Sequence, residues 1–247
     1  MRATAIEFRL RMAINVAIVV LGFWAPWIDV WGVGRHISLL EWLALALSRT
    51  GRFSFALATS VAIVLASLLA AAGVVFRVWG AAYLGPETVI SPEMKGDSVI
   101  AAAPYRFVRN PLYLGLWFMI AAMSFIMPAT GALVTMVLIT LFLFRLILGE
   151  EAYLSAKLGE PYREYLRAVP RIIPRIRSSL PRSTARPHWA QAALTELTPI
   201  GVFFATAFLS WRYDQRLTMR VILITYGVSL VMRALMPGVR RETDLAA

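Results

Sequence analysis

Two short stretches of this chain carry polar side chains that could bind a small charged ligand. The first motif, residues 104–115, reads Pro-Tyr-Arg-Phe-Val-Arg-Asn-Pro-Leu-Tyr-Leu-Gly. The second motif, residues 150–174, begins with Glu150 and Glu151 and contains Leu-Gly-Glu-Pro-Tyr and Val-Pro-Arg-Ile-Ile-Pro. Adjacent carboxylates at the end of an apolar segment are poor lipid anchors, and ionisable groups at membrane depth are costly. The pair therefore favours a functional role.

The composition indicates an all-α integral membrane protein. Of 247 residues, 59% are apolar and 16% are charged, whereas soluble domains have about 45–50% and about 25%. The net charge of +11 lies mainly between apolar segments, which favours anionic head groups over nucleic acid as partner. Cysteine is absent and there are only two histidines. We therefore expect no disulfide, no cysteine nucleophile and no metal cluster.

Hydropathy predicts about six transmembrane helices. They cover residues 12–31, 54–76, 112–127, 130–148, 194–211 and 218–236, each compatible with a bilayer span. The first span lacks a cleavage-type pattern and is expected to remain as an anchor. Most of the 25 Lys and Arg residues fall in alternate loops, which predicts that both termini are cytoplasmic, in a bacterial inner membrane.

Three regions follow from these spans. Residues 1–92 would hold the first two helices, 93–176 the two motifs with helices three and four, and 177–247 a basic linker and a C-terminal helix pair. Arg77 ends the second span and is expected to extend to head groups.

Proline and glycine lie at the expected helix ends in both motifs. Asn110 before Pro111 is a plausible N-cap, and the helix N-terminus behind it suits an anionic ligand group. Gly159 is a plausible C-cap, and Pro161 suits the start of a short helix that carries Tyr162 and Tyr165. An ordinary capped helix and a surface amphipathic helix would explain each motif separately.

The arrangement of the apolar hairpin favours a shared site instead. The Pro-Ala-Thr-Gly run at 128–131 permits a tight reversal between spans three and four, so both motifs would lie at the same membrane face. Glu150 and Glu151 lie about 100° apart around their helix, so only one of them can face a given pocket.

Together the motifs resemble those of the isoprenylcysteine carboxyl methyltransferase family and its phospholipid methyltransferase relatives, over residues 97–174. That family has G-x-Y and R-H-P-x-Y-x-G, followed by E-E-x-x-L, F-G-x-x-Y and V-P-x-x-x-P. The resemblance implies a membrane-embedded methyltransferase that uses S-adenosylmethionine and releases S-adenosylhomocysteine. By position, the cofactor would be held by Asp97, Ser98, Val99, Ile100, Tyr105, Asn110, Pro111, Leu112, Tyr113 and Glu150.

Some positions depart from the family pattern. Ala103 stands in place of a glycine and Asn110 in place of a histidine, which removes a proton shuttle there. Where the prenylcysteine enzymes carry an arginine for the substrate carboxylate, this chain has Leu146. Arg145 lies one position away and is a candidate contact for the acceptor. The resemblance therefore implies a lipid-like acceptor, methylated at a carboxylate or at a phospholipid amine, and no catalytic side chain is assigned.

Two other functions are considered. An NADPH-dependent sterol-type reductase would share a similar R-H-P-x-Y signature and a tyrosine-rich second motif, although the Glu150–Glu151 pair favours the methyltransferase. A non-enzymatic scaffold or transporter would bind no cofactor, and the scarcity of ionisable residues within the spans is unfavourable for a transporter.

Overall fold

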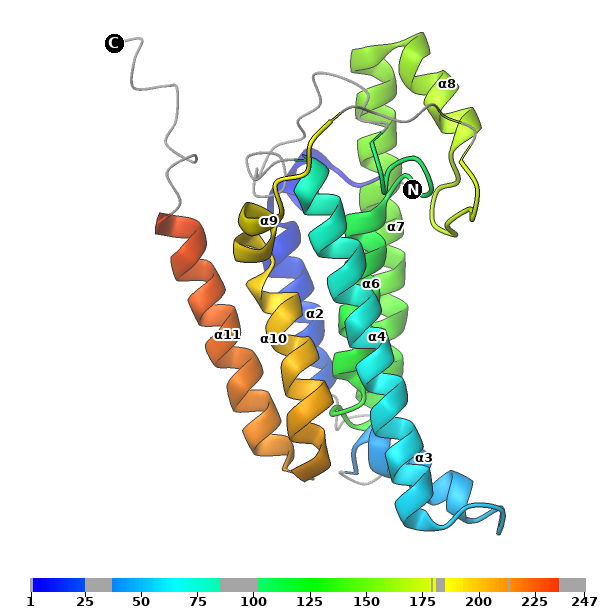
Figure 1. Cartoon of the computed structure of the whole chain (residues 1–247), viewed down its shortest axis with the longest axis vertical. Coiled ribbons are helices and arrows are strands. Elements are labelled where there is room, and N and C mark those ends of the chain that lie inside the picture. The colour runs from blue at the N-terminus through cyan, green and yellow to red at the C-terminus, as the bar shows by residue number, and fades with distance from the viewer. Residues whose placement is uncertain are drawn as a thin grey trace.

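The computed structural model describes residues 2–24, 37–84, 102–178, 180, 185–212 and 214–235. Within these residues the chain is helical and has no strand, only an isolated bridge between Ser38 and Pro128 (Figure 1). The helices are α1 (Ala5–Arg9), α2 (Arg11–Phe23), α3 (Leu39–Ser48), α4 (Phe55–Leu84), α6 (Pro111–Ser124), α7 (Ala129–Leu158), α8 (Glu160–Ala168), α9 (Trp189–Thr195), α10 (Leu197–Phe204), a π-helical turn (Ala205–Leu209), a 3₁₀ turn (Ser210–Arg212) and α11 (Gln215–Leu235). The all-α prediction is confirmed for this part of the chain.

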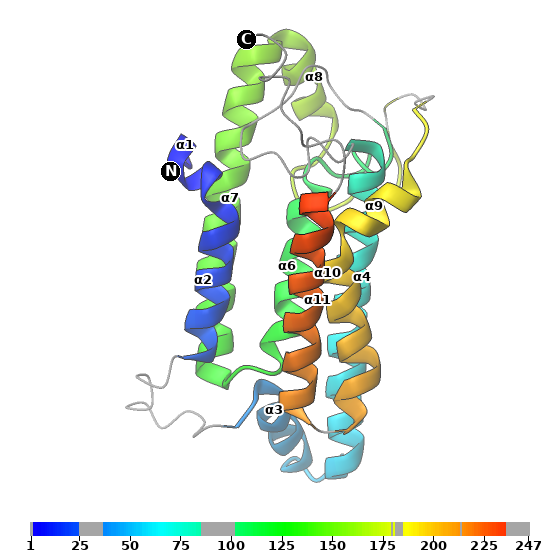
Figure 2. The same cartoon turned by 90° about the vertical axis from the view of Figure 1, so that its left-hand side faces the viewer.

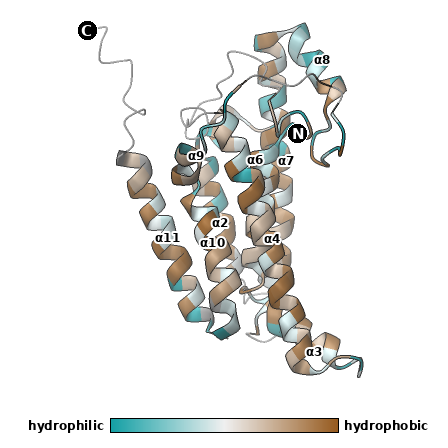
Figure 3. Cartoon of the chain, viewed as in Figure 1, coloured by the Kyte–Doolittle hydropathy of each residue, from teal (hydrophilic) through white to brown (hydrophobic). Residues whose placement is uncertain are grey.

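Two helices among the described residues are long and apolar enough to cross a membrane. These are α4 and α7, with 30 residues each. A third crossing results if α9 and the helical run 197–212, which meet at a 72° bend, count as one broken span. The apolar helices α2, α3 and α6 are shorter, and apolar residues dominate the bundle in Figure 3. An integral membrane protein is thus indicated, while six spans remain a prediction.

The predicted hairpin is present, with its reversal slightly earlier than expected. Helix α6 ends at Ser124 and α7 begins at Ala129 with Pro128 as its N-cap. Thr130 and Gly131 therefore lie inside α7 and not in the turn, because proline is well placed just before a helix, where its missing N–H is not needed. Helix α8 also forms as predicted, directly after Gly159, whose φ is +66°.

Helix α3 closes the hairpin end of the bundle. Ser38 and Glu41 form a capping box, a recognised signal for a helix start. The N–H groups of Leu39 and Leu40 donate to the carbonyls of Met127 and Phe125, at 2.8 and 3.0 Å. The α6–α7 turn is therefore held by the beginning of α3, which the hydropathy analysis did not predict.

Helices of the bundle approach each other closely at glycine residues. Helix α4 packs along α6, where the backbones approach at Gly73 and Gly115. Helix α2 packs on α7, where Gly22 meets Gly131 and Thr135. Gly115 therefore serves helix packing.

Both motifs lie at one end of the bundle. The starts of α2 and α6 and the ends of α7 and α11 share this end, and α8 lies beyond it (Figures 1 and 2). We call it the motif end. The beginning of α2 and the end of α11 on one side agree with the predicted topology, and a cytoplasmic orientation of that side remains a prediction.

Replacement of Gly131 by alanine should destabilise the bundle by about 1–3 kcal/mol. A Cβ at this position would overlap the carbonyl oxygen of Gly22, so α2 and α7 must separate. Thermal unfolding in detergent measures the effect. Gly227→Ala is the matched control, because a Cβ there meets open space. Equal loss of stability in both variants would contradict close α2–α7 packing.

Candidate functional site

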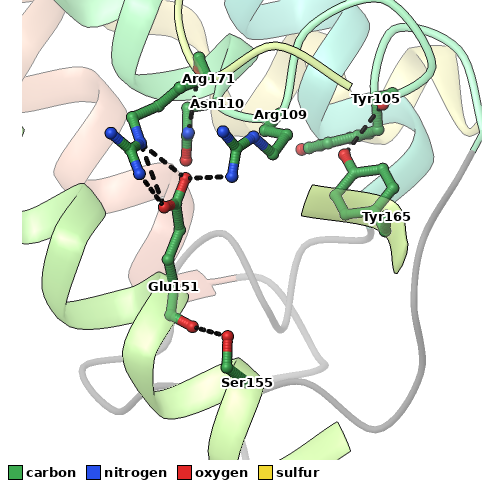
Figure 4. Close-up of polar contacts among 7 residues, drawn as sticks. All are labelled: Tyr105, Arg109, Asn110, Glu151, Ser155, Tyr165 and Arg171. Atoms are coloured by element: carbon green, nitrogen blue, oxygen red, sulfur yellow. Dashed lines mark hydrogen bonds and ion pairs between the residues drawn. The ribbon is translucent and has the colours of Figure 1, made fainter. Parts of the chain in front are cut away.

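Glu151 links the two motifs at the motif end. Its carboxylate is buried, with 6% of the residue exposed. It pairs with Arg109 Nη1 of the first motif at 3.0 Å and with Arg171 Nη2 of the second at 2.9 Å (Figure 4). Arg171 Nε also donates to the carboxylate, at 3.1 Å to each oxygen. The carboxylate therefore sits between two guanidinium groups that come from segments far apart in the sequence.

Backbone hydrogen bonds extend this link. The N–H of Arg109 donates to the carbonyl of Pro170 at 2.9 Å, and the N–H of Arg175 donates to the carbonyl of Phe107 at 3.0 Å. Asn110 is the N-cap residue of α6, but its side chain makes no capping bond. Its Nδ2 donates instead to the carbonyl of Arg171 at 3.1 Å. The prediction that this side chain caps α6 is thus wrong, because the hydrogen bond from Nδ2 orients its amide group toward the second motif.

Two buried tyrosines join the same assembly. The Tyr165 hydroxyl donates to the Tyr105 carbonyl at 2.9 Å, and the Tyr105 hydroxyl donates to the Gly80 carbonyl of α4 at 3.3 Å. Burial raises the pKa of both phenols, and that of Tyr162, above the usual value, since phenolate is disfavoured away from water. All three phenols therefore stay protonated, and Tyr105 and Tyr165 keep the hydrogen bonds that they donate.

Glu150 faces a different set of neighbours. It shares a hydrogen bond with the hydroxyl of Tyr113 on α6, and Arg11 of α2 is close enough to interact with both. The neighbouring carboxylates thus point to different surroundings, as helical geometry predicted. Glu151 serves the motif link, and Glu150 lies with Tyr113 and Arg11 between three helices.

Other predicted site residues fall in several places. Pro111 is the first residue of α6, and the carbonyl of Leu112 accepts a hydrogen bond from Arg77 at 3.3 Å. Asp97, Ser98, Val99 and Ile100 lie outside the described residues. Arg145 Nη2 binds both carboxylate oxygens of Glu7 at 2.8 Å, so it ties α1 to α7. An acceptor contact by Arg145 remains untested.

Glu196 was not predicted as a site residue, and Arg77 has other contacts than predicted. Glu196 lies at the bend between α9 and α10 and is 0% exposed. Arg77 donates from Nε at 2.5 Å and from Nη2 at 2.8 Å to its two oxygens. Arg77 therefore lies within α4 and pairs inside the bundle, and its predicted extension to head groups is wrong. A glutamate at the start of an apolar segment was the available signal.

The Arg77–Glu196 pair lines a cavity of about 220 Å³ that we call the inner cavity. Its walls are mainly apolar side chains of α2, α6 and α11, with residues from the start of α10. Because Arg77 also contacts the first turn of α6 through Leu112, this polar part of the cavity adjoins the turn that carries Tyr113.

Comparison with known families gives one match. Residues 61–160 match the model of the phospholipid methyltransferase family, which confirms the resemblance for the first motif and for the start of the second. The matched segment covers most of α4, the first motif, α6, α7 and the first residue of α8. Neither the curated proteins nor the solved structures contain a match to the chain.

Removal of the Glu151 carboxylate should unfold the motif end more readily. In Glu151→Ala, Arg109 keeps a buried charge without its partner, and breaking a buried pair costs about 3–5 kcal/mol. Chemical or thermal unfolding in detergent tests this. Glu160→Ala is the control, because Glu160 pairs with Arg163 and Arg167 at the surface and should cost under about 1 kcal/mol. Similar losses would show that Glu151 does not hold the motifs.

The buried tyrosines should make stability fall above about pH 10. The unfolded chain releases phenol protons near pH 10, whereas the folded chain keeps them to higher pH. The folded state thus binds more protons, and stability is lost as pH rises through this range. Unfolding at pH 9 and pH 11 should show a smaller drop for Tyr165→Phe than for the wild type. Tyr153→Phe, at an exposed position, should keep the full drop. An equal drop in Tyr165→Phe would contradict the assignment.

Proposed function

Because residues 61–160 match the model of the phospholipid methyltransferase family, we propose that this chain is an S-adenosylmethionine-dependent membrane methyltransferase. Its acceptor is lipid-like, with transfer to an isoprenylcysteine-type carboxylate or to a phospholipid amine. The cofactor is proposed to bind at the motif end, on the cytoplasmic face.

One observation carries the proposal. Glu150 and Tyr113, taken from the two motifs that the family resemblance assigns to the cofactor, lie together at the motif end. They adjoin the inner cavity, because Arg77 lies on that cavity and binds the turn that carries Tyr113. A polar group for a soluble cofactor and an apolar space for a lipid thus lie next to each other.

The residues present fit S-adenosylmethionine. A carboxylate at Glu150 accepts hydrogen bonds from hydroxyl or ammonium groups, and the face of Tyr113 attracts a sulfonium cation by about 0.5–2 kcal/mol. The first turn of α6 has no side-chain cap, so its N–H groups suit a carboxylate. Asp97, Ser98, Val99 and Ile100 are proposed to complete the site, with Tyr105, Asn110, Pro111 and Leu112.

When bound, S-adenosylmethionine supplies a methyl group on a sulfonium sulfur, which passes to the acceptor oxygen or nitrogen as the carbon–sulfur bond breaks and a neutral sulfide remains. The chain contributes alignment. Glu150 and Tyr113 hold one side, and the Glu151 link keeps the second motif against the first. Apolar walls exclude water, so proximity in a dry site supplies most of the rate enhancement.

A reductase is the second candidate among enzymes. It also requires a charged cofactor at the motif end, so the choice of ligand separates the two functions. The family match favours the methyl donor.

We predict that Glu150→Gln weakens binding of S-adenosylhomocysteine by about tenfold or more, the worth of a charge-assisted hydrogen bond. Glu151→Gln should have a milder effect on affinity per folded molecule, because its carboxylate binds Arg109 and Arg171 instead. Isothermal titration calorimetry of the purified full chain measures both.

The same titration with NADPH is the control for the alternative function. Unchanged affinity for S-adenosylhomocysteine in Glu150→Gln would reject the site assignment. Binding of NADPH alone by the wild type would replace the methyltransferase with the reductase.

A further inference from the structure

The inner cavity is built partly by helices outside the matched family segment. Helix α2 contributes Asn15 and Val19, and α11 contributes Leu223 and Ser229. Glu196 comes from the bend before α10. Since residues 61–160 contain neither α2 nor α9–α11, the properties of this cavity belong to this chain and do not follow from the family match.

Two buried polar side-chain atoms lie along the cavity. Asn15 Oδ1 and Ser229 Oγ have no hydrogen-bond partner within the part of the chain that the structure describes. The two residues are only 8% and 1% exposed, and they lie on different helices. A buried polar atom without a partner costs free energy, so a ligand that supplies hydrogen bonds here would be stabilised.

The charges of Arg77 and Glu196 on the cavity wall balance each other. Glu196 binds Arg77 through both carboxylate oxygens, so the pair has no net charge. Arg77 still has N–H groups beyond those that bind Glu196 and Leu112 in the described structure. The cavity thus offers hydrogen bonds without a net charge, and an ion with unbalanced charge would be costly to bury there.

The walls of the cavity also include exposed apolar side chains. Helix α2 packs against α7, and α11 packs against α10, so the cavity separates two groups of helices (Figure 2). Val20 and Leu223 on its walls are about half exposed or more, at 53% and 60%. An acyl chain of the surrounding bilayer can therefore continue into the cavity along apolar walls.

We propose that the inner cavity binds the hydrocarbon chain of a membrane lipid with a net-neutral head group, and that Glu196 sets this preference by neutralising Arg77. The polar part of the head lies at Arg77, Asn15 and Ser229, next to the turn that carries Tyr113. That this lipid is the methyl acceptor rests on the proposed function. Binding and selection of the lipid do not require that function.

The test measures lipid binding without any methyl donor. The purified full chain is titrated in detergent with lysophosphatidylethanolamine, which is net neutral, and lysophosphatidylglycerol, which is anionic, both with the same acyl chain. Native mass spectrometry gives the two dissociation constants. We expect the wild type to favour the neutral probe. Glu196→Gln should shift the ratio toward the anionic probe by about tenfold or more, because Arg77 then carries an unbalanced charge.

The double variant Arg77→Gln/Glu196→Gln is the matched control for charge, and it should restore the preference for the neutral probe. Leu223→Trp places a larger side chain on the cavity wall and should weaken the binding of both probes. Ile224→Trp is its control, since Ile224 is similarly exposed on α11 but is not among the residues that line the cavity.

An unchanged ratio in Glu196→Gln, or no effect of Leu223→Trp beyond that of Ile224→Trp, overturns the proposal. If Glu196→Gln does not fold, the wild type and the double variant decide, and a wild type without preference for the neutral probe rejects it. Failure of methyl transfer with normal probe selection would reject only the proposed function.

Discussion

The motif end depends on one buried carboxylate. Glu151 lies between Arg109 and Arg171, and these ion pairs are directional, whereas apolar packing is not. Two guanidinium groups close to each other repel unless an anion separates them, so the three residues must come together as a unit. Charge balance thus places the loop before α6 against the segment after α8.

This arrangement leaves Glu150 available for other contacts. Helical geometry turns it away from Glu151 by about 100°, toward Tyr113 and Arg11. The adjacent glutamates therefore divide two tasks between them: one maintains the architecture and the other faces the proposed cofactor site. A single glutamate could not do both, because one carboxylate cannot point in two directions.

Features encoded over short distances were predictable, and contacts between distant segments were not. The hairpin, α8 and the meeting of the motifs follow from proline, glycine and helical period, which act over a few residues. The capping box of Ser38 and Glu41 is an equally local signal for the start of α3. The Arg77–Glu196 pair joins helices 119 residues apart, and no local pattern specifies such a partner. Asn110 shows the same limit. Its side chain was predicted to cap α6, but it donates a hydrogen bond to the distant carbonyl of Arg171 instead.

The unbroken helix α7 sets the height of the site. At about 1.5 Å per residue, Glu150 lies about 32 Å along the axis from Ala129, close to the ~30 Å thickness of the hydrocarbon layer. If the start of α7 lies at one boundary of that layer, the carboxylates emerge at the other, at the depth of the lipid phosphates. The length of α7 then fixes the depth of Glu150 in the membrane. At that depth a water-soluble molecule can reach Glu150 from the aqueous phase, and a membrane lipid can reach it from the bilayer.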